Sequence, residues 1–134
     1  MISVKEIIGD LDIKTLPQEH QDNLKALLEK MNRVRFLYGK PMTVTSGYRS
    51  MAHHLEIYAK KGITDKSKIP LKSKHLFGEA ADIYDPKKEL QRWCVEHESE
   101  LVAIGLWCED FSATKNWVHF QIVPPKSGKR FFMP

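Results

Sequence analysis

The sequence predicts a small α+β domain in which an antiparallel sheet is flanked by helices. Two patterns carry this prediction: stretches with apolar residues at helical spacing, and short β-branched or alternating stretches bounded by turn residues. They follow one another as helix, strand, helix, strand, helix and a two-stranded hairpin. With 134 residues, of which 42% are hydrophobic and 28% charged, the chain fits one domain over residues 1–134 with a single core.

The first long helix is expected over residues 15–38, where apolar residues recur every three or four positions. Thr15 and Gln18 have the spacing of a capping box, and Gly39 is placed to end the helix. A short β-branched strand is expected from Met42 to Thr45.

A second helix is expected over residues 50–61, closing at Gly62. Residues 61–74 are polar, contain Pro70 and show no periodicity, which predicts a long surface loop of the kind that often carries function. The stretch 78–84 reads as the next strand.

A third helix is expected over residues 85–101, with Asp85 as its cap and Pro86 at its first position. Strands over 104–110 and 116–123 follow, joined by a hairpin. The tail is expected to be irregular and to pack back on the domain. Cys94 and Cys108 have no CxxC spacing and are expected to be free.

Asp82 is the residue that points to a functional site. A carboxylate on an apolar strand is costly to bury unless it is paired, hydrogen-bonded or bound to a metal. On a strand, Gly78, Ala80, Asp82 and Tyr84 share one face, and the two small residues are expected to leave open space beside the carboxylate.

His75 and His119 are placed to complete a metal site with Asp82. His75 precedes the strand and can reach over it, and His119 lies on the strand face shared by Trp117 and Gln121. Two histidines and one aspartate make a three-ligand zinc site with the fourth position left to water, as in catalytic zinc centres. His75, Asp82 and His119 are therefore candidate Zn²⁺ ligands, although a lone W-x-H on a strand is more often a packed histidine than a ligand.

Three motifs occur in a fixed order: SGYRS at 46–50, S-x-H-x-x-G-x-A-x-D at 73–82 and W-x-H at 117–119. Together they resemble the zinc D-alanyl-D-alanine carboxypeptidase family. That family includes phage L-alanyl-D-glutamate endopeptidases and the dipeptidases of vancomycin resistance, and it shares its fold with the Hedgehog signalling domain. The resemblance runs from about residue 40 to the end of the chain, and the central motif is fully matched.

The resemblance implies a Hedgehog/DD-peptidase-like fold, the zinc ligands named above and a catalytic role for Arg49. Arg49 would stabilise the negative charge that develops on the scissile carbonyl oxygen. Without the motif, an arginine at a helix start reads as a surface residue in a salt bridge. Ser46, Tyr48, Ser73 and Trp117 are further candidates for substrate contacts. Ser46 and Tyr48 could instead shape the turn, and Ser73 is expected to support the loop that carries His75 through backbone hydrogen bonds.

The sequence departs from the family pattern at the general base. Many relatives place a carboxylate three residues before the last histidine, where this chain has Asn116, and an amide cannot act as a base. Glu109 is the first alternative, because it has the strand parity of Trp107, and Asp110 would serve if the strand contains a bulge. Each could equally be an exposed turn residue.

These features predict a zinc metallopeptidase that hydrolyses a peptide bond next to a D-amino acid in a peptidoglycan stem peptide or crosslink, as a carboxypeptidase or an endopeptidase. The alternative is a non-catalytic, zinc-stabilised binding or phage tail and assembly module, which Asn116 permits. A monomer is expected.

The net charge of +4 predicts attraction to polyanions, which could be nucleic acid, an anionic membrane surface or acidic wall polymers. Only residues 126–132 interleave basic and aromatic residues, so no nucleic-acid partner is expected. No apolar run approaches membrane-spanning length, and the amino terminus lacks a signal-peptide pattern. We therefore expect a protein that is made in the cytoplasm and does not insert into a membrane. Together with this, the family resemblance implies a phage-type protein that reaches the wall after release or as a virion component.

Overall fold

The computed structural model describes all residues from 1 to 134. Helices and strands alternate along the chain, and short 3-10 helices (η) occur between them. The elements in order are α1 (Val4–Ile8), η1 (Ile13–Thr15), α2 (Gln18–Tyr38), β1 (Val44–Ser46), α3 (Met51–Lys60), η2 (Lys66–Lys68), η3 (Lys74–Phe77), β2 (Ala80–Tyr84), α4 (Glu89–Glu96), α5 (Glu98–Ile104), β3 (Trp107–Glu109), β4 (Trp117–Gln121) and β5 (Phe131–Phe132).

The strands form one sheet in the order β1-β2-β4-β3-β5, so the α+β prediction is confirmed. The pairs β1–β2, β2–β4 and β3–β4 are antiparallel, and β3 and β4 form the expected hairpin. The tail differs from the prediction, because β5 pairs with β3 in parallel and makes the sheet mixed. Cys108 N donates to Arg130 O and Asp110 N donates to Phe132 O across this pair.

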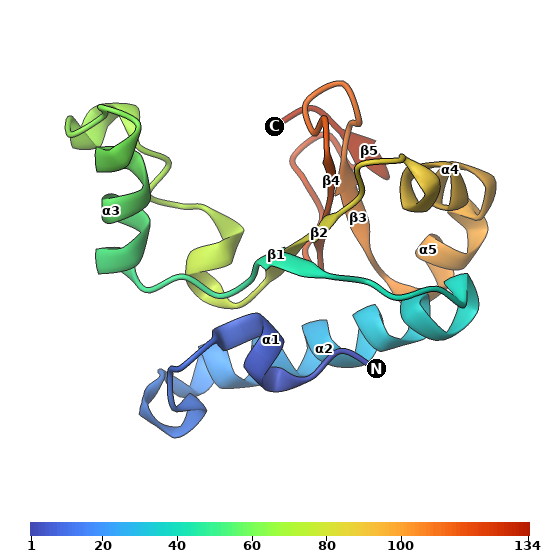
Figure 1. Ribbon diagram of the computed structural model, residues 1–134, viewed down its shortest axis with the longest axis horizontal. Helices are drawn as coiled ribbons and strands as arrows, with labels where there is room; N and C mark the ends of the chain where they lie inside the picture. The colour runs from blue at the N-terminus through green and yellow to red at the C-terminus, as the bar shows by residue number, and fades with distance from the viewer.

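Helix α2 lies along one face of the sheet with α1 beside it, while α4 and α5 gather near the β3 side and α3 stands apart from them (Figure 1). The core lies between α2 and the sheet. It joins the apolar stripe of α2 to the inward side chains of β2 and β4, including Leu24, Leu27, Met31, Val34, Ala81, Ile83, Val118 and Phe120, all 0–3% exposed. Burying each large side chain contributes about 1.5–3 kcal/mol.

The boundaries of α2 show one wrong prediction. Its last residue is followed by Gly39 in the left-handed conformation (φ 76°), as expected, and the Gly39 N–H donates to Arg35 O. The capping box of Thr15 and Gln18 does not form, because Pro17 is the N-cap. Thr15 instead ends η1, where its hydroxyl donates to Asp12 O.

The helix predicted over residues 85–101 is two helices, α4 and α5, which are separated at His97. The His97 ring stacks on Trp93, and its Nδ1 lies 2.9 Å from Trp93 O, so the side chain competes for the backbone carbonyl. Asp85 is not the N-cap residue of α4, which is Lys88, but its carboxylate accepts from Leu90 N and Gln91 N in the first turn of the helix. Pro86 is not at the first helical position, because α4 begins at Glu89.

The remaining elements are close to their predicted positions. The strand predicted from Met42 is found at Val44–Ser46, and α3 begins after Ser50, whose hydroxyl accepts from His53 N. Loop 61–74 contains η2 and is anchored by Ile69, which is 6% exposed. Cys94 and Cys108 are free and buried. None of the helices combines the length and the apolar character that crossing a membrane requires.

Candidate metal centre

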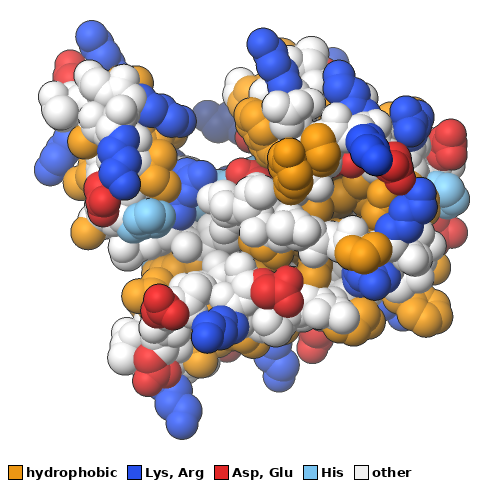
Figure 2. Space-filling view, viewed as in Figure 1, with side chains coloured by type: hydrophobic (Ala, Val, Ile, Leu, Met, Phe, Trp, Pro, Cys, Tyr) orange, Lys and Arg blue, Asp and Glu red, His pale blue; other side chains and the backbone are white.

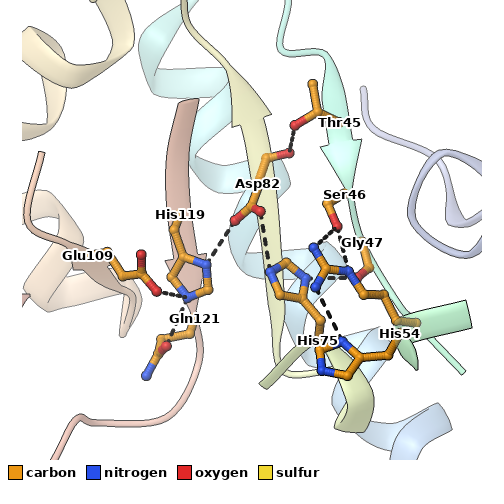
Figure 3. A network of polar contacts seen from close by, with 10 residues as sticks. Thr45, Ser46, Gly47, His54, His75, Asp82, Glu109, His119 and Gln121 are labelled. Carbon is orange, nitrogen blue, oxygen red and sulfur yellow. Dashed lines mark hydrogen bonds and ion pairs between the residues drawn. The ribbon is translucent and has the colours of Figure 1, made fainter. Parts of the chain in front are cut away.

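Strand alternation brings Asp82 and His119 together. The two residues are direct partners in the β2–β4 register. The neighbours Ile83 and Val118 turn into the core with no exposed surface, so Asp82 and His119 must face the opposite side. There, His119 Nδ1 lies 2.8 Å from Asp82 Oδ1 (Figure 3).

His75 comes from η3, the short 3-10 helix before β2, and reaches the same carboxylate from the other side. Its Nδ1 lies 2.8 Å from Gly47 O and must donate to it, because a carbonyl oxygen only accepts. The other ring nitrogen, Nε2, lies 3.3 Å from Asp82 Oδ2 (Figure 3). The two imidazole rings have centroids 5.3 Å apart.

The donor atoms of His75, Asp82 and His119 all lie within 4.8 Å of one another. Ligands at about 2.0–2.2 Å from one tetrahedral ion lie about 3.4 Å apart, so the observed spacing suits a shared Zn²⁺. The Asp82 side chain is 13% exposed, which leaves the cluster open on one side. The donor set and its opening therefore fit a zinc ion with one position for a further ligand.

Each imidazole is also fixed from behind. His119 Nε2 lies 2.9 Å from Gln121 Oε1, and Gln121 Nε2 donates to Val123 O at 2.8 Å. With its Nε2–H given to Gln121, His119 turns Nδ1 toward the Asp82 carboxylate, and the bond to Gly47 likewise leaves Nε2 of His75 to face Asp82; these are the two nitrogens that a metal would take. Such outer partners fix the tautomer and the orientation of histidine ligands.

The charge of Asp82 is held by the two histidines. Burial alone would raise the pKa of Asp82, but hydrogen bonds from His119 and His75 outweigh it and hold the pKa well below its usual value. Burial would also lower the pKa of His119, and its hydrogen bond to Asp82 reverses this and raises the pKa. Asp82 is therefore in the carboxylate form that a metal requires.

Arg49 lies at the edge of this cluster and has no acidic partner. Its Nε and Nη2 donate to Ser46 Oγ at 3.1 and 2.8 Å, and its Nη1 lies 3.4 Å from His54 Nδ1. No ion pair in the structure involves Arg49, so the structural salt bridge is not found. The backbone N–H of Arg49 donates to His75 O, which joins Arg49 to η3.

The structure brings Glu109 to the site and leaves Asp110 outside it. Glu109 Oε1 lies 3.9 Å from His119 Nε2, too far for a hydrogen bond, so the carboxylate is not committed to that ring. The Asp110 carboxylate accepts from Ser112 N and Ser112 Oγ, which lower its pKa. The Asn116 side chain is exposed, and the backbone carbonyl of Asn116 accepts from Asp85 N.

A cavity of about 910 Å³ opens over the cluster. Ser73 and Trp117 are part of its wall, whereas Ser46 and Tyr48 are not. Ser46 holds Arg49, and the Tyr48 hydroxyl lies 3.0 Å from His20 Nδ1. The cavity is lined by Arg49, Tyr58, Pro70, Leu71, Lys72, Ser73, Lys74, His75, Asp82, Glu109, Trp117, His119, Gln121, Pro125, Lys126, Ser127, Phe132, Met133 and Pro134.

Gly78 was expected to leave space beside Asp82 on the strand, but the structure gives it a different role. It lies before β2, not in it, and has a left-handed conformation with φ 74°. A Cβ there would lie 2.8 Å from Leu24 Cγ and 3.0 Å from His20 O. The glycine therefore lets η3 pack closely on α2, and it does not create space beside Asp82.

Sequence reasoning missed the supporting roles of His54 and Gln121. Strand alternation places Gln121 on the face of His119, as expected, but it does not show that the two side chains hydrogen-bond to each other. His54 is completely buried, although it lies next to the exposed His53 in the first turn of α3. No pattern in the sequence distinguishes these two adjacent histidines.

A family model described as peptidase M15 matches residues 3–121. The chain belongs to the peptidase M15 family. The match begins at residue 3, earlier than the motif-based resemblance from about residue 40, so α1 and α2 are part of the family domain. Peptidase M15 proteins are zinc metallopeptidases, and the cluster of His75, Asp82 and His119 could hold the metal. No curated protein and no solved structure matches the chain.

Proposed function

We propose that this peptidase M15 chain hydrolyses a peptide bond next to a D-amino acid in a peptidoglycan stem peptide or crosslink, as a carboxypeptidase or an endopeptidase. One observation carries the proposal. A single open cavity contains the His75, Asp82 and His119 donors, the unpaired guanidinium of Arg49 and the uncommitted carboxylate of Glu109.

The charges that line the cavity support an anionic peptide as substrate. Four basic side chains line it, against two acidic ones, Asp82 and Glu109: Arg49, Lys72, Lys74 and Lys126. Figure 2 shows Lys and Arg side chains around the hollow between the α3 side and the strand side of the molecule. Stem peptides carry free carboxylates, which such a lining attracts and orients.

The chain's own residues supply the positioning and the proton transfer. A bound Zn²⁺ would polarise the scissile carbonyl and make water a stronger nucleophile. Arg49 is placed to donate charge-assisted hydrogen bonds to the carbonyl oxygen as its negative charge develops. Glu109 accepts the proton of the attacking water and returns it to the leaving amine, so the proton balance closes within one turnover.

A second candidate is a zinc-stabilised module that binds wall peptides or a phage tail partner without cleaving them. The observation that favours it is Asn116, an amide at the position where many relatives have the catalytic carboxylate. Under this function the ligands and the basic lining would serve recognition alone.

The setting that suits either function is a phage-type protein that meets the bacterial wall after release or as a virion component. We propose that it acts as a monomer on wall peptides and needs neither nucleic acid nor insertion into a membrane. The cationic cavity would concentrate it at the anionic wall.

Mass spectrometry of purified peptidoglycan digested by the zinc-loaded protein, with and without a chelator, tests the proposal. New muropeptides that disappear with the chelator and return with added zinc are the expected result, and their masses identify the bond. Tight zinc binding with no cleavage of any wall peptide would overturn the enzymatic proposal and favour the binding module.

A further inference from the structure

We propose that His54 is a positioning residue that orients Arg49 and joins it to loop 61–74, the wall of the cavity that leads to His75. This inference rests on the proposed function, in which Arg49 acts on the scissile carbonyl. His54 lies in the first turn of α3 and has no exposed surface.

Both ring nitrogens of His54 contact functional parts of the cavity. Nε2 lies 2.9 Å from Pro70 O in loop 61–74, and Nδ1 lies 3.4 Å from Arg49 Nη1. Figure 3 shows the His54 ring below the His75 ring, on the side away from His119. Because burying an unsatisfied polar ring is costly, these two contacts account for a histidine at a fully buried position.

The partners determine the state of the ring. A carbonyl oxygen only accepts and a guanidinium only donates, so Nε2 must carry the proton and Nδ1 must accept from Arg49. The ring is therefore neutral. Burial, with the nearby charge of Arg49 as a further cause, lowers the pKa of His54, which agrees with this assignment.

Neutral acceptors are the important feature of this arrangement. Ser46 Oγ and His54 Nδ1 fix the guanidinium of Arg49 from two sides without adding a negative charge. A carboxylate in the place of His54 would hold the group equally well, but it would neutralise the charge that the substrate oxygen needs. The arrangement thus keeps Arg49 oriented and fully cationic within the cavity.

His54 also connects Arg49 to the metal ligands through the loop. Pro70 O accepts from Ser73 N, and Ser73 O accepts from Leu76 N, next to His75. A bond from His54 to Pro70 therefore anchors the segment that supplies His75. Arg49 N donates to His75 O and closes this circuit.

A purely structural role for His54 makes a different prediction from a positioning role. The ring packs on Tyr58 with centroids 5.1 Å apart, and phenylalanine would preserve that packing. His54→Phe keeps the ring and removes both hydrogen bonds, whereas His54→Gln keeps one donor and one acceptor. The pair separates packing from orientation.

The test uses the zinc-loaded full chain and the muropeptide cleaved by the wild type. We expect His54→Phe to lower kcat by about 10- to 100-fold, as for a displaced catalytic group, with zinc content unchanged. His54→Gln should restore most of kcat, and the exposed neighbour variant His53→Phe should match the wild type. Equal kcat for His54→Phe and wild type, or equal losses for both His54 variants, would overturn the inference.

A second measurement is independent of catalysis and of whether either variant folds. Nitrogen NMR of the wild-type protein at neutral pH should show His54 as the neutral Nε2–H tautomer, with slowly exchanging guanidinium protons on Arg49. An imidazolium or an Nδ1–H tautomer at His54 would overturn the inference. If the wild type cleaves no wall peptide, the proposed function fails, and this measurement still decides the role of His54.

Discussion

Asp82 and His119 are direct partners across β2 and β4, and His119 Nδ1 lies 2.8 Å from Asp82 Oδ1. The register that joins them is fixed by the core, because Ile83 and Val118 pair at the next position with no exposed surface. A slip of one residue would bury Asp82 and expose that pair. The apolar alternation of two strands therefore specifies both the core and the metal site.

Removal of a ligand should remove zinc. The wild type should hold about one zinc per chain, and His75→Ala or Asp82→Ala should weaken binding by more than about 100-fold, since loss of an outer-shell partner alone costs about 10–100-fold. Metal analysis and competition with a chelator measure the change. The control is His53→Ala, which alters an exposed histidine outside the cluster. Ligand variants that bind zinc as tightly as the wild type would contradict the site.

Loss of the outer partner of His119 should have a smaller effect. Gln121→Leu removes the acceptor 2.9 Å from His119 Nε2 and leaves a buried donor unsatisfied. We expect zinc affinity to fall by about 10–100-fold. Gln121→Glu keeps an acceptor at this position and should bind zinc at least as tightly as the wild type. Equal affinities for the Leu and Glu variants would show that this hydrogen bond does not orient His119.

The sequence was sufficient to predict the elements whose signals are local and periodic. The α2 stripe gave its position through four buried residues, and period-two alternation placed His119 opposite to the core-facing Val118 and Phe120. The order of the motifs identified the family. These features depend on spacing within one segment, which a sequence displays directly.

The sequence was insufficient where a long-range contact decided the structure. The pairing of Phe131 with Cys108 makes the tail a strand, although it lacks the length and pattern of one. Glu109 and Asp110 are adjacent in the sequence, and only the turn hydrogen bonds to Ser112 separate their roles. The burial of His54 depends on the path of the distant Pro70.

Variants of the adjacent carboxylates Glu109 and Asp110 test which of them is the general base. Glu109→Gln should lower kcat by about 100- to 10,000-fold, the usual contribution of a general acid–base group, with zinc content unchanged. Asp110→Asn changes an adjacent carboxylate that is engaged in a turn, and it should leave kcat within a small factor of the wild type. Steady-state cleavage of a defined muropeptide measures both. A larger loss in the Asp110 variant would transfer the base role to Asp110.

Gly47 links the stability of the fold to the orientation of His75. A Cβ at Gly47 would collide with the backbone of Ile7 in α1, including its carbonyl oxygen and, at 2.8 Å, its Cα. Since a helix backbone cannot yield as a side chain can, Gly47→Ala should lower the free energy of unfolding by about 3 kcal/mol. Denaturant unfolding of the metal-free protein measures this cost.

The same variant should weaken zinc binding by about tenfold, because Gly47 O is the acceptor that holds His75 Nδ1 at 2.8 Å and its displacement disturbs the ligand. Gly62→Ala is the matched control. Gly62 has a φ of 79° and no atom within 4 Å of the position that an added methyl group would take, so its substitution adds only backbone strain of about 1–2 kcal/mol. Zinc affinity should be unchanged in that control. If Gly47→Ala were as stable as Gly62→Ala and bound zinc like the wild type, the close approach of α1 to Gly47 would not support the metal centre.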